Sequence, residues 1–143
     1  MAKTTEHLVE EILDREAIRD LSARYCHYVW TNDVEGMLSI FTADGMLSIQ
    51  EDDRGARVTK GADALRQFYT RLDTSNRPRP YVHNNIIELQ GAGHATGVCY
   101  VELRAGSDQM NWAGTGYYHD EYVKDGGTWK FKARRFWMVQ GNR

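Results

Sequence analysis

The chain has 143 residues, of which 41% are hydrophobic and 27% are charged, with 13 glycines and 2 prolines. This composition is typical of one globular domain, residues 1–143, and excludes a disordered or collagen-like chain. With 18 basic against 20 acidic residues, the net charge of −2 gives no positive field for a polyanion, so we expect no nucleic-acid partner.

Motifs for membranes, metals and cofactors are not recognised in the sequence. No apolar run reaches the roughly 20 residues that a membrane helix needs, and residues 1–11 are polar and acidic, so we expect a cytoplasmic protein without a membrane partner. Cys26 and Cys99 have no metal-binding spacing to any histidine, which predicts free thiols and no metal. No GxGxxG opens a helix after a strand, and phosphate-binding loops and Gly-x-Ser-x-Gly are missing, so no cofactor is expected.

The first half of the chain has mainly helical patterns. Between residues 14 and 30, apolar side chains recur every three or four positions, which predicts an amphipathic helix with one buried stripe. A second, short helix is expected after a cap at Asn32 or Asp33, ending at residues 44–45. A third is expected from residue 61 or 62 to residue 72.

Strand patterns dominate the second half. Short runs at 45–50 and 56–59 predict a hairpin, and longer strands are expected at 81–89, 95–104, 111–124 and 128–139. Helices followed by an antiparallel meander predict an α+β fold. In this fold the N-terminal helices pack in the concavity of a strongly curved, mixed, mainly antiparallel sheet, because each element must bury its apolar face.

Five short motifs occur in an order typical of one fold family: AIRDLSARY at 17–25, FTADG at 41–45, HNN at 83–85, YHDEY at 118–122 and GTWKF at 127–131. On these motifs the chain resembles the SnoaL-like branch of the nuclear transport factor two-like superfamily, which has a cystatin-like α+β cone. The resemblance implies a conical apolar cavity, in which many members use a cofactor-free acid or base. Other members do not catalyse reactions, so the fold alone does not select an activity.

His83 is the candidate proton-transfer residue. In the enzymes that the chain resembles, an Asp near the end of the first helix orients a His on the first long strand. Here Trp30 stands at the position of the Asp and Tyr81 at that of the His, but strand alternation places His83 on the same face as Tyr81. We therefore predict that His83 faces the cavity as a general acid or base. The alternative is a strand histidine bonded to Asn85 or to a backbone carbonyl.

Tyr25 and Arg134 are the other candidate catalytic residues that the resemblance implies. Tyr25 matches the hydroxyl donor of ketosteroid isomerases and can hydrogen-bond an oxygen on which negative charge develops. Arg134 corresponds to a cavity arginine of dehydrochlorinase-like members and can hold an anionic group, although one bulge would exchange it for Arg135. The alternatives are a core aromatic for Tyr25 and a solvated basic strand face for Arg134.

Two further positions depart from the pattern of these enzymes. The ketosteroid isomerase base falls near Ile49, which cannot take a proton, and the Asp expected on the second long strand falls at Leu103. We interpret Asp120 as structural, paired with Arg134 or Lys132. An inward-facing Asp120 would instead supply the missing carboxylate.

Aromatic and polar residues near these candidates are expected to line the pocket, where rings can stack on a planar ligand. The alternative is that they are ordinary core residues. The candidate substrate-binding residues are Trp30, Phe68, Tyr81, Asn85, Tyr118 and Trp137.

These features favour a cofactor-independent lyase, dehydratase or isomerase that uses acid–base chemistry on a small hydrophobic molecule, aromatic or polycyclic in kind. The alternative is a non-catalytic ligand-binding or assembly domain that resembles the small subunit of ring-hydroxylating dioxygenases. Members of the superfamily associate through the convex side of the sheet, and Tyr100, Trp112 and Tyr117 have outward parity. We therefore expect a homodimer or homotrimer.

Overall fold

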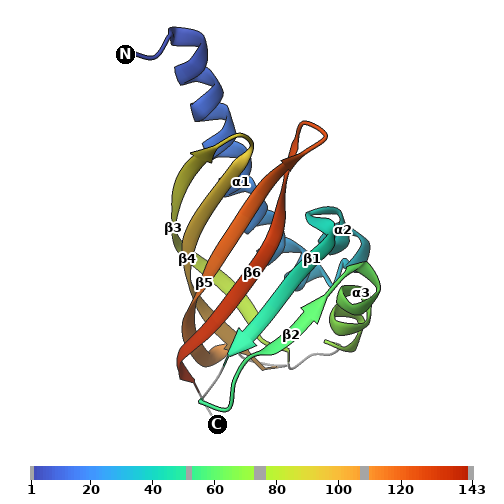
Figure 1. The fold of residues 1–143 in the computed structure, drawn as a ribbon. Coiled ribbons are helices and arrows are strands. Elements are labelled where there is room, and N and C mark those ends of the chain that lie inside the picture. The colour runs from blue at the N-terminus through green and yellow to red at the C-terminus, as the bar shows by residue number, and fades with distance from the viewer. Residues whose placement is uncertain (1, 51–52, 73–76, 107–109, 142–143) are drawn as a thin grey trace.

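The computed structural model describes residues 2–50, 53–72, 77–106 and 110–141. Two helices come first, a strand pair separates them from a third helix, and a long meander of strands follows (Figure 1). The elements are α1 (Thr5–Thr31), α2 (Val34–Ser39), β1 (Phe41–Gln50), β2 (Arg57–Lys60), α3 (Ala62–Arg71), β3 (Arg79–Gly91), β4 (His94–Ala105), β5 (Asn111–Asp125) and β6 (Thr128–Gly141).

Helix α1 is longer than the sequence pattern predicted, because it begins at Thr5 rather than near residue 14. The Thr4 hydroxyl accepts a hydrogen bond from the backbone N–H of His7 at 3.2 Å and caps the first turn. The helix ends at Asn32, which adopts a left-handed conformation with φ 55°. The predicted buried stripe is confirmed, and its apolar members are Ile18, Leu21, Tyr25 and Val29.

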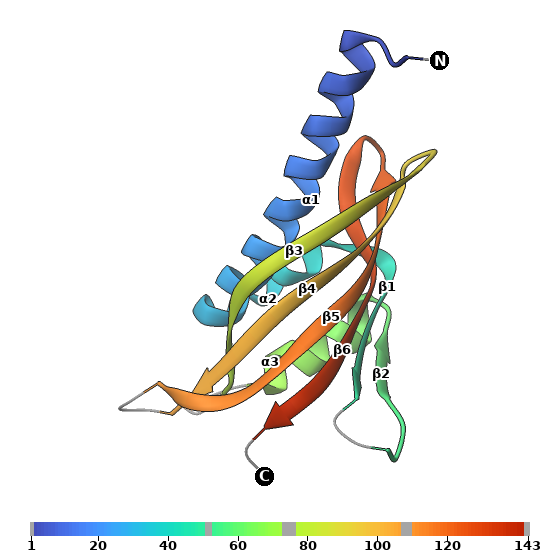
Figure 2. The ribbon, with the colours of Figure 1, turned by 90° about the vertical axis from the view of Figure 1, so that its left-hand side faces the viewer.

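The amino-terminal turns of α1 extend beyond the sheet, as Figure 2 shows. There Ile12 and Leu13 are 64% and 62% exposed. Asp14 ties the helix to the strands, because its carboxylate accepts a hydrogen bond from the Trp129 indole at 2.7 Å. No helix in the described ranges is long and apolar enough to cross a membrane.

Helix α2 is capped by Asp33, whose carboxylate accepts a hydrogen bond from the backbone N–H of Gly36 at 2.8 Å. The prediction that this helix continues to residues 44–45 is wrong, because α2 ends at Ser39 and β1 follows directly. The reason is tertiary: the carbonyl of Ile40 accepts a hydrogen bond from the N–H of Phe131 at 2.8 Å, and β1 pairs with β6 from there on. Strand pairing therefore overrides the local helical pattern.

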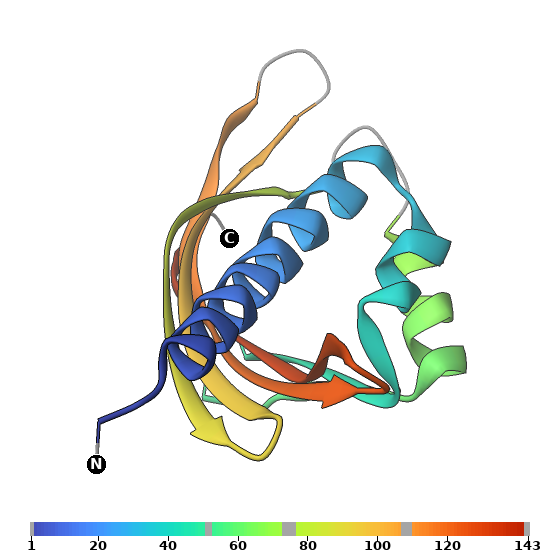
Figure 3. The same ribbon diagram turned by 90° about the horizontal axis from the view of Figure 1, so that it is seen from above.

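The six strands form one sheet in the order β2-β1-β6-β5-β4-β3. The pair β1–β6 is parallel and the other neighbouring pairs are antiparallel, including the predicted β1–β2 hairpin. Figure 3 shows the sheet curving around α1, so that the helix lies on its concave side and the sheet stays open. The predicted α+β architecture is confirmed.

Two bulges decide which side chains of β3 and β6 face α1. The register of β3 against β4 skips His83, and the register of β6 against β5 skips Lys132. A skipped residue reverses the alternation of the strand beyond it. After the second bulge, Arg134 and Phe136 are buried on the inner face, and Arg135 lies on the outer face.

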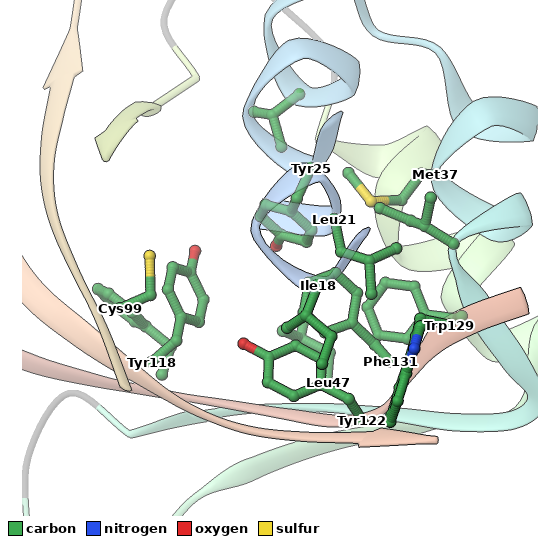
Figure 4. Close-up of a cluster of buried hydrophobic side chains, with 14 of the residues drawn as sticks. Ile18, Leu21, Tyr25, Met37, Leu47, Cys99, Tyr118, Tyr122, Trp129 and Phe131 are labelled. Carbon is green, nitrogen blue, oxygen red and sulfur yellow. The ribbon is translucent and has the colours of Figure 1, made fainter. Parts of the chain in front are cut away.

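The core between α1 and the concave face is rich in aromatic side chains (Figure 4). Tyr25 lies at its centre and packs edge-on against four rings at centroid distances of 5.7 to 6.5 Å. Such edge-to-face contacts are the favoured geometry for aromatic pairs. The four rings are those of Phe41, Tyr69, Tyr118 and Phe131.

Candidate functional site

An apolar cavity of about 210 Å³ lies between α1, α3 and the concave face of the sheet. It extends from the exposed Arg57 on β2 to the side chains of Tyr25 and Tyr118, which are only 4% and 6% exposed. An apolar cavity of about 150 Å³ accepts benzene, so this one suits a molecule of one or two rings. Its apolar walls include Val29, Leu47, Ile49, Phe68, Leu103 and Met138.

Three buried phenols meet at the closed end of the cavity. Tyr25 is the central one, because the Tyr69 hydroxyl donates to its oxygen at 2.9 Å and the Tyr118 ring packs edge-on against its ring with the centroids 5.7 Å apart. Because the Tyr25 oxygen accepts the hydrogen bond from Tyr69, the proton of Tyr25 is left for a further acceptor. This phenol triad can therefore donate one hydrogen bond to an oxygen placed in the cavity.

Burial raises the pKa of all three phenols above the ordinary tyrosine value. For Tyr25, the Arg134 charge and the neighbouring hydroxyls of Tyr69 and Tyr118 oppose this rise in pKa. The pKa values of Tyr69 and Tyr118 are raised further, because the neighbouring Tyr25 hydroxyl disfavours their ionised forms. The triad is therefore neutral at neutral pH.

A buried ion pair between Arg134 and Asp120 lies directly behind the phenols. The guanidinium donates from Nε to Oδ1 at 2.9 Å and from Nη2 to Oδ2 at 3.2 Å, and the side chains are 1% and 0% exposed. The Tyr122 hydroxyl donates to Oδ2 at 2.9 Å. The guanidinium carbon lies 3.8 Å from the Tyr118 ring centroid and 4.4 Å from that of Tyr25. A positive charge therefore lies against the rings of the two phenols that line the cavity.

The surroundings of this ion pair keep the arginine charged. Burial alone would lower the pKa of Arg134, but Asp120 and the nearby phenols raise it well above its ordinary value. Burial raises the pKa of Asp120, while Arg134 and the Tyr122 hydroxyl oppose the rise. The predicted pairing of Asp120 with Arg134 is confirmed, and the carboxylate also faces inward, although it is closed off from the cavity.

Four of the predicted site residues come together here. Tyr25, Tyr118 and Phe68 line the cavity, and Arg134 lies behind the two tyrosines. Arg134 is 1% exposed and already bound to Asp120. Its guanidinium therefore contacts the phenol rings and does not reach the open space of the cavity.

His83 lies outside the cavity, so the predicted direction of its side chain is wrong. The side chain is 57% exposed, and its Nε2 lies 3.5 Å from Oε2 of Glu102 on the neighbouring strand. The bulge at His83 reverses the alternation, and Asn85 and Ile87 follow on the face toward α1. Asn85 donates to the Ser22 hydroxyl at 3.2 Å, so it lies beside the buried ion pair instead of lining the cavity.

The other aromatic residues expected to line the pocket also lie outside it. The Trp30 indole donates to the carbonyl of Pro80 at 3.0 Å, and its ring packs against that of Tyr81 with the centroids 5.3 Å apart. These contacts fasten the end of α1 to β3, so Trp30 neither lines nor blocks the cavity. Trp137 is 39% exposed on the outer face. Beyond the bulge at Lys132 the even-numbered residues of β6 face inward, so the odd-numbered Trp137 faces outward.

Two residues of the site were missed by the sequence reasoning. Tyr69 is buried one position after Phe68, and the helical spacing from Leu65 is a signal that could have found it. Arg57 lies directly across the hairpin from Ile49, and this placement becomes visible only when the register of β1 and β2 is known.

The chemistry of the lining is limited to hydrogen bonding and one positive charge. Among the described residues that line the cavity, none carries a carboxylate or an imidazole. Within the same described ranges, no three His, Cys, Asp or Glu side chains gather as a metal site would require. The site can bind and polarise an oxygen of an apolar molecule.

Two of the three residues expected at an assembly surface are neighbouring rings on the outer face of the sheet. Tyr100 is 44% exposed there, and its ring centroid lies 5.7 Å from that of Tyr117. Trp112 is half-buried, with its indole donating to the Thr115 hydroxyl at 3.1 Å. The expected homodimer or homotrimer stays a prediction.

The sequence of the chain matches a known domain family over most of its length. The SnoaL-like domain aligns with residues 10–135. The chain belongs to the SnoaL-like family. No curated protein sequence matches this SnoaL-like chain closely enough to count as a relative.

Solved structures share the SnoaL-like fold. An NTF2-like protein with a cystatin-like fold from Novosphingobium aromaticivorans is 18% identical, with a TM-score of 0.84 over 99% of this chain and 94% of that one. Rv3472 of Mycobacterium tuberculosis, whose function is unknown, is 26% identical, with a TM-score of 0.78 over 95% and 76% of the two chains. A hexachlorocyclohexane dehydrochlorinase of Novosphingobium barchaimii is 19% identical, with a TM-score of 0.77 over 94% and 92%. These identities support a common fold.

Proposed function

We propose that this SnoaL-like protein binds a small hydrophobic, aromatic or polycyclic molecule and converts it without a cofactor, as a lyase, dehydratase or isomerase. The observation that carries the proposal is the Tyr25 hydroxyl, which accepts a hydrogen bond from Tyr69 and keeps its own proton at the closed end of an apolar cavity. The shared fold with a hexachlorocyclohexane dehydrochlorinase is consistent with small-molecule chemistry in such a cavity.

In the proposed reaction, Tyr25 donates a hydrogen bond to a carbonyl oxygen of the substrate. A hydroxide ion from solvent, entering at the open mouth, takes a proton from the carbon next to this carbonyl and leaves as water. The electron pair of the broken C–H bond moves toward the carbonyl oxygen, so negative charge develops there and the hydrogen bond strengthens. The Arg134 guanidinium, 4.4 Å from the Tyr25 ring, further stabilises this charge. The apolar walls lower the local dielectric constant around the phenols, which makes each of these electrostatic interactions stronger than it would be in solution.

A second candidate function is ligand binding without conversion. It is favoured by the lining itself, because the described wall residues include no carboxylate or imidazole that could take a proton. On this alternative, the same phenols bind the ligand oxygen and no carbon–hydrogen bond breaks.

β-Tetralone, a two-ring ketone, distinguishes the two candidates. Calorimetry measures its binding, and deuterium uptake from heavy water at its α-carbons measures proton removal. We expect binding together with exchange faster than in buffer. Tyr25→Phe should lower the exchange rate about 100-fold or more, the cost of one lost donor to a developing oxyanion. Tyr100→Phe, on the outer face, is the matched control and should leave the rate unchanged.

The outcomes separate cleanly. Binding without exchange would replace the enzyme proposal with the binding alternative. The absence of both binding and exchange, for β-tetralone and for a panel of one- and two-ring ketones and phenols, would contradict both candidates. Thermal unfolding of each variant shows whether a lost signal comes from a lost fold.

A further inference from the structure

The two ends of the cavity differ in charge. At the closed end are neutral phenols, and at the open end is the guanidinium of Arg57. Between them the walls are hydrophobic, and no other described lining residue carries a charged side chain. A ligand that complements this surface has one polar group at each end of an apolar body.

Arg57 is directed toward the cavity by the register of the β1–β2 hairpin. It pairs with Ile49, a residue of the cavity wall, and Thr59 pairs with the buried Leu47. Because alternate residues of a strand share a face, Arg57 and Thr59 lie on the cavity side of β2. Lys60, by the same alternation, lies on the opposite face.

We propose that the ligand carries a carboxylate, which Arg57 binds at the mouth while Tyr25 binds a neutral oxygen at the far end. This inference deepens the proposed function and rests on it, since it names the substrate class as hydrophobic carboxylic acids with a second oxygen. It makes Arg57 a specificity-determining residue of the cavity.

The chemistry of the guanidinium explains why a carboxylate is the group that fits. Its five N–H donors form a planar fork that matches the two oxygens of a carboxylate, so it can bind a ligand while keeping contacts elsewhere. Arg57 is exposed, so an anion there keeps part of its hydration and is not fully desolvated. The neutral phenols at the closed end offer a hydrogen bond and no charge, which suits a ketone or a hydroxyl group.

The first test compares β-naphthoate with its uncharged amide, β-naphthamide, by calorimetry at low ionic strength. The two probes have the same ring system and differ in charge. We expect the wild-type protein to bind the carboxylate about 5-fold more tightly than the amide, an advantage that falls as salt screens the exposed pair. Arg57→Gln should remove this advantage and leave the affinity for the amide unchanged.

Lys60→Gln is the matched control, because it removes one positive charge from the opposite face of the same strand. It should keep the preference for the carboxylate. Equal affinity for both probes in the wild type, or a preference that survives Arg57→Gln, would overturn the role of Arg57 and leave the proposed function standing. If neither probe binds at millimolar concentration, the cavity is not a site for two-ring molecules, and both proposals fail.

A second probe tests the orientation of the ligand. A hydroxynaphthoate with its hydroxyl group on the ring far from the carboxylate should bind more tightly than β-naphthoate. Tyr25→Phe should remove this gain and keep the dependence on Arg57. If the gain instead survives Tyr25→Phe and vanishes in Arg57→Gln, the ligand lies in the reverse direction and the proposed arrangement is wrong.

Discussion

The two faces of the sheet carry similar ion pairs at adjacent positions of β5 and β6. On the inner face, Arg134 binds Asp120 at 2.9 Å with the side chains 1% and 0% exposed. On the outer face, Arg135 binds Glu121 at 2.7 Å with both side chains 41% exposed. Distance therefore does not distinguish the pairs, but solvent does, because water screens the outer charges and leaves the inner ones dependent on each other.

Removing the inner arginine should have the largest effect on the free energy of unfolding. Arg134→Ala leaves Asp120 buried without its partner and deprives two phenols of a neighbouring charge. We expect a loss of about 3–5 kcal/mol, typical of one partner removed from a buried pair. Urea unfolding followed by circular dichroism measures this loss.

Arg135→Ala is the control that this comparison provides. It breaks the outer pair, where solvent compensates both partners, so the loss should stay below about 1 kcal/mol. Similar losses for the two variants would show that burial does not govern these pairs.

The next effect in size is expected from alkaline pH, which should lower the free energy of unfolding through the buried phenols of the inner face. In the unfolded chain tyrosines ionise near pH 10, whereas burial raises the pKa of Tyr25, Tyr69 and Tyr118 in the folded protein. Above about pH 10 the unfolded chain therefore binds fewer protons than the folded one, and the free energy of unfolding falls as pH rises. The slope is about 1.4 kcal/mol per pH unit for each phenol that stays neutral only when folded.

Urea unfolding at a series of pH values checks this slope. Tyr69→Phe removes one buried phenol. The free energy of unfolding of this variant should therefore fall less steeply with pH than that of the wild type, by about 1.4 kcal/mol per pH unit. A wild-type protein whose stability does not change across this range would mean that the phenols ionise within the folded state.

Substitution of His83 should have the smallest effect. Its side chain is 57% exposed, and its contact with Glu102 is 3.5 Å long. His83→Ala should therefore change the free energy of unfolding by less than about 0.5 kcal/mol and leave ligand affinity unchanged. A large loss of affinity would show that β3 shifts its register when a ligand binds, bringing His83 to the inner face.

The order of elements and the inner stripe of α1 could be predicted, because both depend on periodicity over many residues. Tyr25 was recognised as an inward phenol for this reason. The directions of His83 and Arg134 depend on bulges, and a bulge leaves no mark on the alternation that a single sequence shows. The chain tolerates one extra residue at His83 and at Lys132 because pairing resumes beyond each of them.

The roles of Arg57 and Asp120 depended on partners from other strands. Arg57 lies on an edge strand of four residues, and only its pairing with Ile49 places it at the cavity. Asp120 pairs directly across from Arg134, a neighbour that the sequence allowed but could not distinguish from Lys132. Contacts between strands therefore limited the prediction of the site more than the identity of the residues did.

The parallel pairing of β1 with β6 has a consequence for the order of folding. Phe41 is registered against Phe131, so two neighbours in the sheet are separated by most of the sequence. Closing so long a loop costs entropy before any contact repays it, and a topology of this kind folds slowly. The β1–β2 hairpin cannot join the meander until β6 has been synthesised, and until then the buried faces of Phe41 and Leu47 lack their partners on that strand. Nascent chains are therefore most vulnerable to aggregation in the interval before β6 leaves the ribosome.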